Sequence, residues 1–198
     1  MRLVLATANA GKLRELQALL APLGIDAIAQ SHWQVESVEE TGATFSDNAL
    51  LKARHAAGAT GLAALGDDSG LEVDALDGRP GVHSARYAGQ DASDADNNQK
   101  LLRELQNVPD AGRTARYRCV LALVHSVDDP DPLLCEGTWE GRIATAPAGQ
   151  NGFGYDACFI GNGMRQTAAE LTSDLKNAQS HRGQALRRLV EELAMRQR

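Results

Sequence analysis

The stretch that decides the fold is residues 3–29, LVLATANAGKLRELQALLAPLGIDAIA. Its first five residues form an apolar run that predicts a buried strand. After Gly11, leucines recur at helical spacing until Gly24, which predicts a helix that ends there. Residues 25–29 return to a strand pattern. The first thirty residues therefore predict one strand–helix–strand unit.

The rest of the chain alternates helical and strand patterns in the same way. A helix is predicted over 44–57, and a strand from residue 62 is predicted to stop at Asp67-Asp68-Ser69-Gly70, before an extended segment at 71–76. Asp94 is the predicted N-cap of a third helix, and Ser180 that of the last one. Two long strands are predicted over 116–126 and 133–143. We therefore predict a single α/β domain over residues 1–198.

Composition narrows the class of protein. The chain has 198 residues, 43% of them hydrophobic, which is enough for one substantial core. Its net charge of -6 argues against a nucleic-acid partner that needs a broad basic face. The longest apolar runs, such as 120–124, are too short to cross a bilayer, and residues 1–7 lack the pattern of a signal peptide. We expect a cytoplasmic protein without a membrane partner.

The cysteines carry no signature of a metal site or a disulfide framework. Cys119, Cys135 and Cys158 are widely spaced and form no C-x-x-C pair. Two of them, Cys119 and Cys158, lie among apolar residues, so we expect small buried hydrophobic side chains in a reducing compartment.

The first candidate for chemistry is the turn Thr7-Ala8-Asn9-Ala10-Gly11-Lys12, between the first strand and the first helix. Backbone N–H groups at a helix start, the helix dipole and a lysine together favour a phosphate. The turn is not a Walker A loop, because that motif needs glycine at Ala6 and serine or threonine at Leu13. The alternative is an ordinary turn with a solvated lysine.

Two acidic segments are candidates for a divalent cation. Glu39-Glu40-Thr41-Gly42 precedes a helix that carries Lys52, and its carboxylates can bind a hard cation or simply face solvent. The carboxylates of Asp67 and Asp68 raise each other's cost of ionisation unless a cation compensates, which suits shared metal binding and general-base duty. The alternative is an acidic turn that ends at Gly70.

Two further segments suit a nucleobase. Gly152-Phe153-Gly154-Tyr155-Asp156 places two of the chain's eight Phe, Trp and Tyr residues in one glycine loop, where a ring can stack on a flat ligand. These aromatics can equally be core residues in a turn. His181 and Arg182 follow the predicted cap, where cations oppose the helix dipole unless they face a polar ligand, and Lys176 lies close by in the sequence. The alternative is an exposed arginine without a role.

Taken together, these segments resemble the inosine/xanthosine triphosphate pyrophosphatase family. The matching blocks cover nearly the whole chain in the family's order. They are Leu5-Ala6-Thr7 with Asn9 and Gly11-Lys12, Glu39-Glu40-Thr41-Gly42, Asn48-Ala49 with Lys52-Ala53, Asp67-Asp68-Ser69-Gly70-Leu71, Pro80-Gly81 with Ser84-Ala85-Arg86-Tyr87, Gly152-Phe153-Gly154-Tyr155-Asp156, Glu170-Leu171, and Ser180-His181-Arg182-Gly183-Gln184-Ala185-Leu186. Two departures stand out: Ala8 where relatives often have glycine, and Ala157 where proline is common.

The resemblance implies a long central mixed β-sheet with flanking helices, two lobes around an active-site cleft, and a homodimer. It implies Mg²⁺-dependent hydrolysis of dITP, ITP or XTP to monophosphate and pyrophosphate. By motif, Asp68 is the general base and a magnesium ligand, Glu40 the second ligand, and Asp67 an assistant. The implied substrate-binding residues are Thr7, Ala8, Asn9, Ala10, Gly11, Lys12, Lys52 and Ser69 for the phosphates, and Phe153, Gly154, Tyr155, Asp156, Lys176, His181 and Arg182 for the base.

Three other functions stay open at this point. A nucleotide-binding regulator would keep the cleft without hydrolysis, although Glu40, Asp67 and Asp68 are all present. A related pyrophosphatase could act on modified pyrimidine or other nucleotides. A P-loop NTPase is disfavoured by the absent Walker pattern. The main hypothesis requires Asp68 to lie near Lys12 and Arg182.

Overall fold

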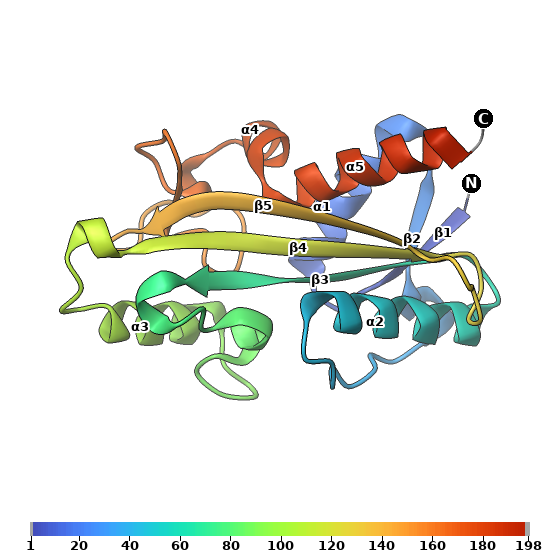
Figure 1. Ribbon diagram of the computed structural model, residues 1–198, viewed down its shortest axis with the longest axis horizontal. Coiled ribbons are helices and arrows are strands. Elements are labelled where there is room, and N and C mark those ends of the chain that lie inside the picture. Colours follow the sequence, from blue (N-terminus) through green and yellow to red (C-terminus); the bar gives the residue numbers. More distant parts are fainter. Residues whose placement is uncertain (1, 197–198) are drawn as a thin grey trace. The chain divides into compact units, whose positions relative to one another are not determined.

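The computed structural model describes residues 2–196, so Met1 and residues 197–198, at the two ends of the predicted domain, lie outside the described part. Its centre is a six-stranded sheet in the order β2-β1-β3-β4-β5-β6 (Figure 1). The strands are β1 Arg2–Ala6, β2 Asp26–Ala29, β3 Ala64–Val73, β4 Thr114–Val124, β5 Leu133–Ile143 and β6 Phe159–Gly161. The α-helices are α1 Ala10–Leu20, α2 Phe45–Thr60, α3 Asp94–Glu104, α4 Ser173–Gln179 and α5 His181–Arg196.

The sheet is mixed, as predicted. β1 pairs in parallel with both β2 and β3, whereas β5 pairs antiparallel with β6. The predicted strand–helix–strand unit is confirmed, because α1 connects two parallel neighbours and Gly24 adopts φ +70° just after the short 3-10 turn Ala21–Leu23 that follows α1. A parallel pair needs a crossover of this kind.

The chain divides into two compact units. Unit 1 comprises 1–68, 119–137 and 182–198, and unit 2 comprises 69–118 and 138–181. Neither is a continuous stretch, and β3, β4 and β5 each contribute residues to both. Within the described residues, no helix combines the length and apolar character needed to cross a membrane.

Unit 1 has helices on both faces of its sheet. α1 and α5 cover one face and α2 covers the other (Figure 1). The leucines of the first face, among them Leu16, Leu20 and Leu186, form one core cluster with strand residues such as Leu65 and Leu121. On the second face α2 packs so closely that a Cβ at Gly66 would lie 2.0 Å from the backbone oxygen of Ala49.

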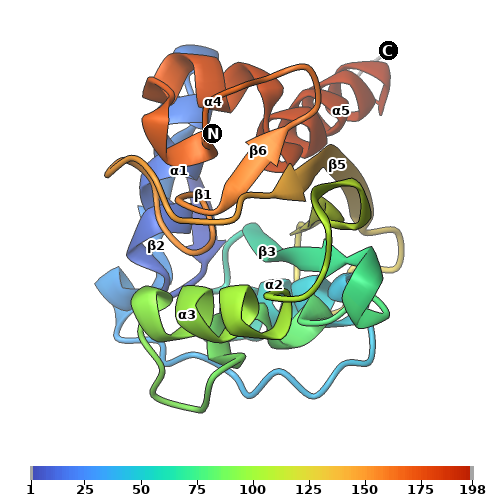
Figure 2. The same ribbon diagram turned by 90° about the vertical axis from the view of Figure 1, so that its left-hand side faces the viewer.

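Unit 2 has its own core and also carries a helix on each face of its strands, α3 on one and α4 on the other (Figure 2). Tyr117, Trp139 and Phe159 pack their rings together there. Cys158 belongs to this core and Cys119 to that of unit 1, and both are fully buried, as predicted.

Three details of the sequence prediction were wrong. β3 does not stop at Asp67-Asp68-Ser69-Gly70 but runs through it to Val73, because the two carboxylates have cationic partners and need not face solvent. The N-cap of α3 is Ser93, one residue before Asp94. Neither α4 nor the three-residue β6 was predicted, whereas the last helix begins directly after Ser180, as expected.

Candidate active site

Asp67 and Asp68 face opposite sides of the sheet. Successive side chains of a strand alternate between its two faces, and both residues lie in the interior of β3. Asp67 contacts Lys12 of α1 and Arg182 of α5, whereas Asp68 contacts Lys52 of α2. The two carboxylates therefore form their ion pairs with different cations.

Asp67 is the centre of a buried ion network. Its Oδ1 lies 2.9 Å from the Nζ of Lys12, and its Oδ2 accepts a 2.7 Å hydrogen bond from the Nε of Arg182. The guanidinium of Arg182 also pairs with Glu15. Burial alone would raise the pKa of Asp67, but Arg182 and Lys12 lower it well below its usual range. The charge on Asp67 is thus favoured by its two cationic partners, which it holds in place.

Asp68 is more accessible and has a different electrostatic environment. Its Oδ1 lies 2.7 Å from the Nζ of Lys52, and its Oδ2 accepts a hydrogen bond of 3.2 Å from Asn48. Burial raises the pKa of Asp68 above its ordinary value, although Lys12 and Lys52 oppose that shift. A carboxylate with a raised pKa is a better proton acceptor, which suits the predicted general base.

Glu40 joins the same cluster through Lys52. The Nζ of Lys52 lies 2.8 Å from Glu40 Oε1 and 2.7 Å from Asp68 Oδ1. Burial alone would lower the pKa of Lys52, but Asp68 and Glu40 raise it. The loop before α2 is fixed by Asn48, whose Oδ1 accepts from the backbone N–H of Gly42 at 2.7 Å.

This donor set fits a magnesium ion. Within residues 2–196 no three His, Cys, Asp or Glu side chains gather as a metal site, and Glu40 and Asp68 form a pair of carboxylates around the Nζ of Lys52. Mg²⁺ commonly binds one or two carboxylates and completes its coordination with water and substrate phosphates. The two carboxylate oxygens already converge on a single cationic nitrogen, that of Lys52.

The predicted phosphate turn forms the start of α1. Asn9 is the N-cap, and its Oδ1 accepts from the backbone N–H groups of Gly11 and Lys12 at 2.9 and 3.0 Å. Thr7 Oγ1 accepts from the N–H of Asn9. Ala8 and Ala10 complete the turn. Two of the N–H groups expected to face phosphate are therefore satisfied by the side chain of Asn9, while Lys12 points to Asp67.

In unit 2 the glycine loop presents one aromatic ring and buries the other. Phe153 is half-buried, and the Nζ of Lys176 lies 5.0 Å from its ring centroid. Tyr155 is buried in the core, and its hydroxyl donates to the backbone oxygen of Ser84 at 2.8 Å. Core packing thus describes Tyr155, while the half-buried Phe153 keeps part of its ring accessible for stacking.

Asp156 connects this loop to α4 and to the core. Its Oδ2 accepts from the backbone N–H of Phe153 at 2.9 Å and pairs with the ammonium of Lys176. Its Oδ1 accepts from the hydroxyl of Tyr117 at 3.3 Å. The ring of Tyr117 stacks on His181, with centroids 4.6 Å apart and planes 8° apart. Four predicted base-binding residues therefore belong to one cluster of unit 2.

The sequence matches the model of the Ham1 family over residues 3–192. The chain belongs to the Ham1 family.

Relatives of this Ham1-family chain are similar over almost their whole length. It is 56% identical to a dITP/XTP pyrophosphatase of Shigella flexneri over 192 residues, which cover 97% of this chain and 98% of the relative. Among solved structures it is similar to a HAM1 protein of Coxiella burnetii, with a TM-score of 0.89, 51% identity and coverage of 98% and 99%. It is also similar to a nucleoside-triphosphatase/dITP/XTP pyrophosphatase of Mycobacterium abscessus, with a TM-score of 0.76, 46% identity and coverage of 98% and 100%. The family resemblance drawn from the motifs is confirmed.

The predicted site residues of this Ham1-family protein gather in two clusters, one in each unit. Lys12, Glu40, Lys52, Asp68 and Arg182 lie in unit 1. Lys12 and Arg182 pair with Asp67, however, and not with Asp68, whose ion pair is with Lys52. The cluster in unit 2 consists of Phe153, Gly154, Tyr155, Asp156, Lys176 and His181. Ser69 follows Asp68 on β3 and belongs to unit 2.

Sequence reasoning missed two partners of these residues. Glu15 lies one turn after Lys12 on α1, a spacing that would have indicated a shared helix face. Tyr117 lies 39 residues before Asp156 in a strand with buried positions, and no local pattern distinguishes it from a core tyrosine. Arg182 is 1% exposed, so the alternative of a surface arginine is wrong.

Proposed function

We propose that this protein hydrolyses the deaminated purine nucleotides dITP, ITP and XTP to the nucleoside monophosphate and pyrophosphate. Family membership and the dITP/XTP pyrophosphatases among its relatives support this activity. The observation that carries the proposal is the convergence of Glu40 and Asp68 on one cationic nitrogen, with a second lysine at the neighbouring Asp67. Paired acidic oxygens suit a divalent ion, and lysines suit a polyphosphate chain.

Asp68 is the proposed general base. It accepts a proton from the water that attacks the α-phosphorus in line, and its raised pKa favours this role at neutral pH. Asn48 and Lys52 fix its two carboxylate oxygens, so that the acceptor atom has a defined direction. Asp67 assists from the other face by keeping Lys12 in place.

Glu40 and Asp68 are the proposed ligands of Mg²⁺, which when bound neutralises phosphate charge and lowers the barrier to attack on phosphorus. Lys12 and Lys52 stabilise the charge that builds on the departing pyrophosphate. The backbone of Thr7-Ala8-Asn9-Ala10-Gly11 and the hydroxyl of Ser69 are the remaining phosphate contacts in the proposal. The dipole at the start of α1 favours the same anion.

The base is proposed to stack on Phe153, near Gly154, Tyr155 and Asp156. Lys176 and backbone N–H groups only donate hydrogen bonds, and a 6-keto purine offers an acceptor where adenine offers a donor. Arg182, also expected at the base, is paired in unit 1 with Asp67 and Glu15 and is left out of the proposed base contacts. His181 completes the proposed set. With adenine, a donor of the protein faces the 6-amino group and is left without a partner, which can reduce kcat/KM by orders of magnitude. ATP should therefore be a poor substrate. Guanine shares the 6-keto group, and its rejection needs an obstacle to the 2-amine.

Steady-state pyrophosphate release across dITP, ITP, XTP, GTP and ATP, with and without a chelator, tests the proposal. We expect kcat/KM for ITP and XTP to exceed that for ATP and GTP by at least about a hundredfold. Chelation should abolish turnover, and added Mg²⁺ should restore it. Comparable efficiency with GTP would contradict the specificity, and unchanged rates in chelator would contradict the metal.

The resemblance also supports a homodimer, and we include it in the proposal. Light scattering of the purified chain measures this directly through its molar mass. The proposed compartment is the cytoplasm, where nucleoside triphosphates are synthesised and thiols stay reduced. The three cysteines are buried as free thiols, in keeping with such a compartment.

A further inference from the structure

The loop that carries Phe153 is fixed at one end by charged partners. There Asp156 accepts from the backbone N–H of Phe153 and pairs with Lys176. The backbone N–H of Asn151 donates to the oxygen of Ala169 at 3.0 Å. These contacts fix the backbone on either side of Phe153. None of them involves Gly154, the residue that follows Phe153.

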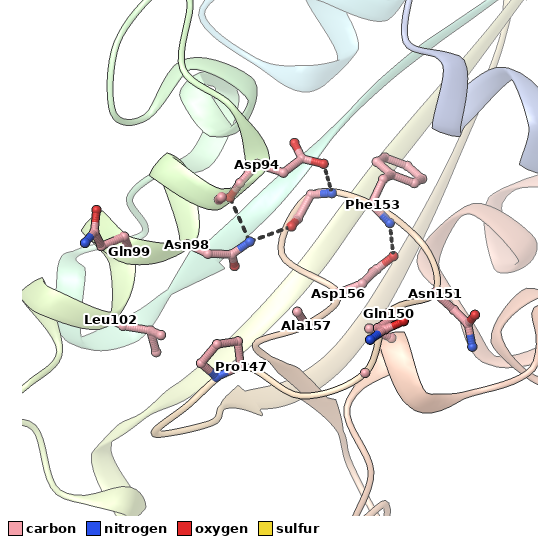
Figure 3. Close-up of a pocket in the computed structure, with 14 residues that line it drawn as sticks. Asp94, Asn98, Gln99, Leu102, Pro147, Gln150, Asn151, Phe153, Asp156 and Ala157 are labelled. Carbon is pink, nitrogen blue, oxygen red and sulfur yellow. Dashed lines mark hydrogen bonds between the residues drawn. The ribbon is translucent and has the colours of Figure 1, made fainter.

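Gly154 is fixed by α3. Its backbone N–H donates to Asp94 Oδ2 at 2.6 Å, and its backbone oxygen accepts from Asn98 Nδ2 at 2.8 Å (Figure 3). The same Asn98 amide donates to the backbone oxygen of Asp94 at 2.8 Å. Both backbone polar groups of Gly154 pair with two side chains that lie four residues apart on one helix face.

The helix presents these two side chains in fixed positions. α3 begins with a capping box in which Ser93 and Asp96 satisfy each other's backbone N–H groups. Asp94 occupies the first turn, where the helix dipole favours an acidic side chain. Its carboxylate is therefore placed before the loop contacts it.

Packing of α3 against the loop contributes little to the position of Gly154, because a cavity of about 540 Å³ lies between α3 and the loop. Leu102 and Pro147 are among the residues that line it, together with Phe153 (Figure 3). Gly152 and Gly154 have φ of +76° and +60°, so the loop backbone has wide conformational freedom. The two hydrogen bonds to Gly154 therefore act together with the Asp156 bond to the Phe153 N–H and the ammonium of Lys176 over the ring in placing Phe153.

We propose that Asp94 and Asn98 are positioning residues that fix the Phe153 ring for the nucleobase. This inference rests on the proposed function, because it assigns to α3 the placement of the base-stacking ring. Neither residue takes part in the hydrolysis itself. Their removal should therefore weaken the contribution of the base while leaving hydrolysis of the phosphate chain unchanged.

The test compares Asp94→Ala and Asn98→Ala with wild type on ITP and on methyl triphosphate, which has no base. We expect KM for ITP to rise about tenfold in each variant, the effect of one hydrogen bond with a charged or fixed partner, with kcat changed less than about twofold. Rates with methyl triphosphate should match wild type. Gln99→Ala is the control, since Gln99 lines the same cavity one residue from Asn98.

Two conservative variants separate positioning from general damage. Asp94→Asn keeps an oxygen that can accept from Gly154 and should restore most of the ITP affinity. In Asn98→Leu the new side chain has the branched shape of asparagine. The substitution also removes Oδ1, a buried atom without a hydrogen-bond partner in the described part of the chain. It should therefore fold stably, yet show the same rise in KM for ITP as Asn98→Ala.

The inference is overturned if the alanine variants bind ITP like wild type, or if they lose ITP and methyl triphosphate turnover equally. The proposed function has a separate outcome in the same experiment. If wild-type enzyme itself hydrolyses methyl triphosphate as efficiently as ITP, base recognition is absent and the proposed function fails before any variant is compared.

Discussion

The two clusters are built on different kinds of backbone. In unit 1 the charged groups project from β3, α1, α2 and α5, and buried ion pairs fix them. In unit 2 the half-buried ring of Phe153 lies on a loop with positive φ at Gly152 and Gly154, beside a cavity, and backbone hydrogen bonds fix it. Substitutions in the unit 1 cluster should therefore lower the catalytic rate or the free energy of unfolding, whereas substitutions in the loop should weaken the affinity for the nucleotide.

The largest effect should come from Asp68→Asn. Loss of the proton acceptor should reduce kcat by roughly 10²- to 10⁴-fold, the contribution typical of a general base. Asn48 and Glu40 keep partners, so the melting temperature should change little. Pyrophosphate release and thermal unfolding measure both; turnover near the wild-type rate would refute the role of Asp68.

The neighbouring substitution, Asp67→Asn, should act mainly on stability. It removes the charge between Arg182 and Lys12, and loss of one partner of a buried pair costs about 3–5 kcal/mol. Since the folded pKa of Asp67 is lowered, its stabilisation is complete above the unfolded pKa of about 3.9 and is lost as the pH falls further. Denaturant unfolding at pH 7 and pH 3 should therefore show a smaller difference from wild type in acid. An equal difference at both pH values would contradict this.

Phe153→Ala probes the loop directly. Stacking of a base on an aromatic ring contributes about 1–3 kcal/mol, so KM for ITP should rise roughly tenfold to a hundredfold with little change in melting temperature. Isothermal titration calorimetry with IMP and with pyrophosphate shows whether the affinity is lost for the nucleoside part or for the phosphate part of the substrate. A weaker affinity for pyrophosphate than in wild type would show that the ring does not act on the base.

A matched pair of glycine substitutions sharpens the contrast. In Gly66→Ala the new Cβ would lie 2.0 Å from the Ala49 oxygen, so α2 must move and the free energy of unfolding should fall by about 1–3 kcal/mol. In Gly152→Ala it would lie 2.0 Å from Asp156 Oδ2, at φ +76°, which should displace the loop and raise KM with a smaller loss of stability. The reverse pattern in unfolding and kinetics would remove the distinction between the clusters.

The smallest expected effect is a loss of stability at alkaline pH, caused by the titration of Tyr87 in unit 2. Burial and then the hydrogen bond to Glu104 raise the pKa of Tyr87 to about 12. The stabilisation by the neutral phenol is thus complete below the unfolded pKa of about 10 and is lost as the pH rises towards 12. Wild type should lose more stability than Tyr87→Phe between pH 9 and 11.5. Parallel losses in denaturant unfolding would exclude this titration.

Much of unit 1 was predictable because its signals are local. The apolar run and leucine spacing of residues 3–29 indicated β1, α1 and β2, and the helix predicted over 44–57 is α2, with Thr44 as its N-cap. Asp67 and Asp68 were predicted at a strand end, since an acidic pair followed by glycine is typical of turns. Their partners come from helices far away in the sequence, which no window of residues reveals.

The sequence by itself determined the family, the alternation of strands and helices, and the residue types available for phosphate, metal and base. Only folding placed Asp67 and Asp68 on opposite faces of one sheet, buried Tyr155 in the core while Phe153 stays half-buried, and brought α3 to Gly154. The physical reason is that motifs record local chemistry, whereas the pKa of a carboxylate and the position of a ring depend on burial and on partners that only folding brings within reach.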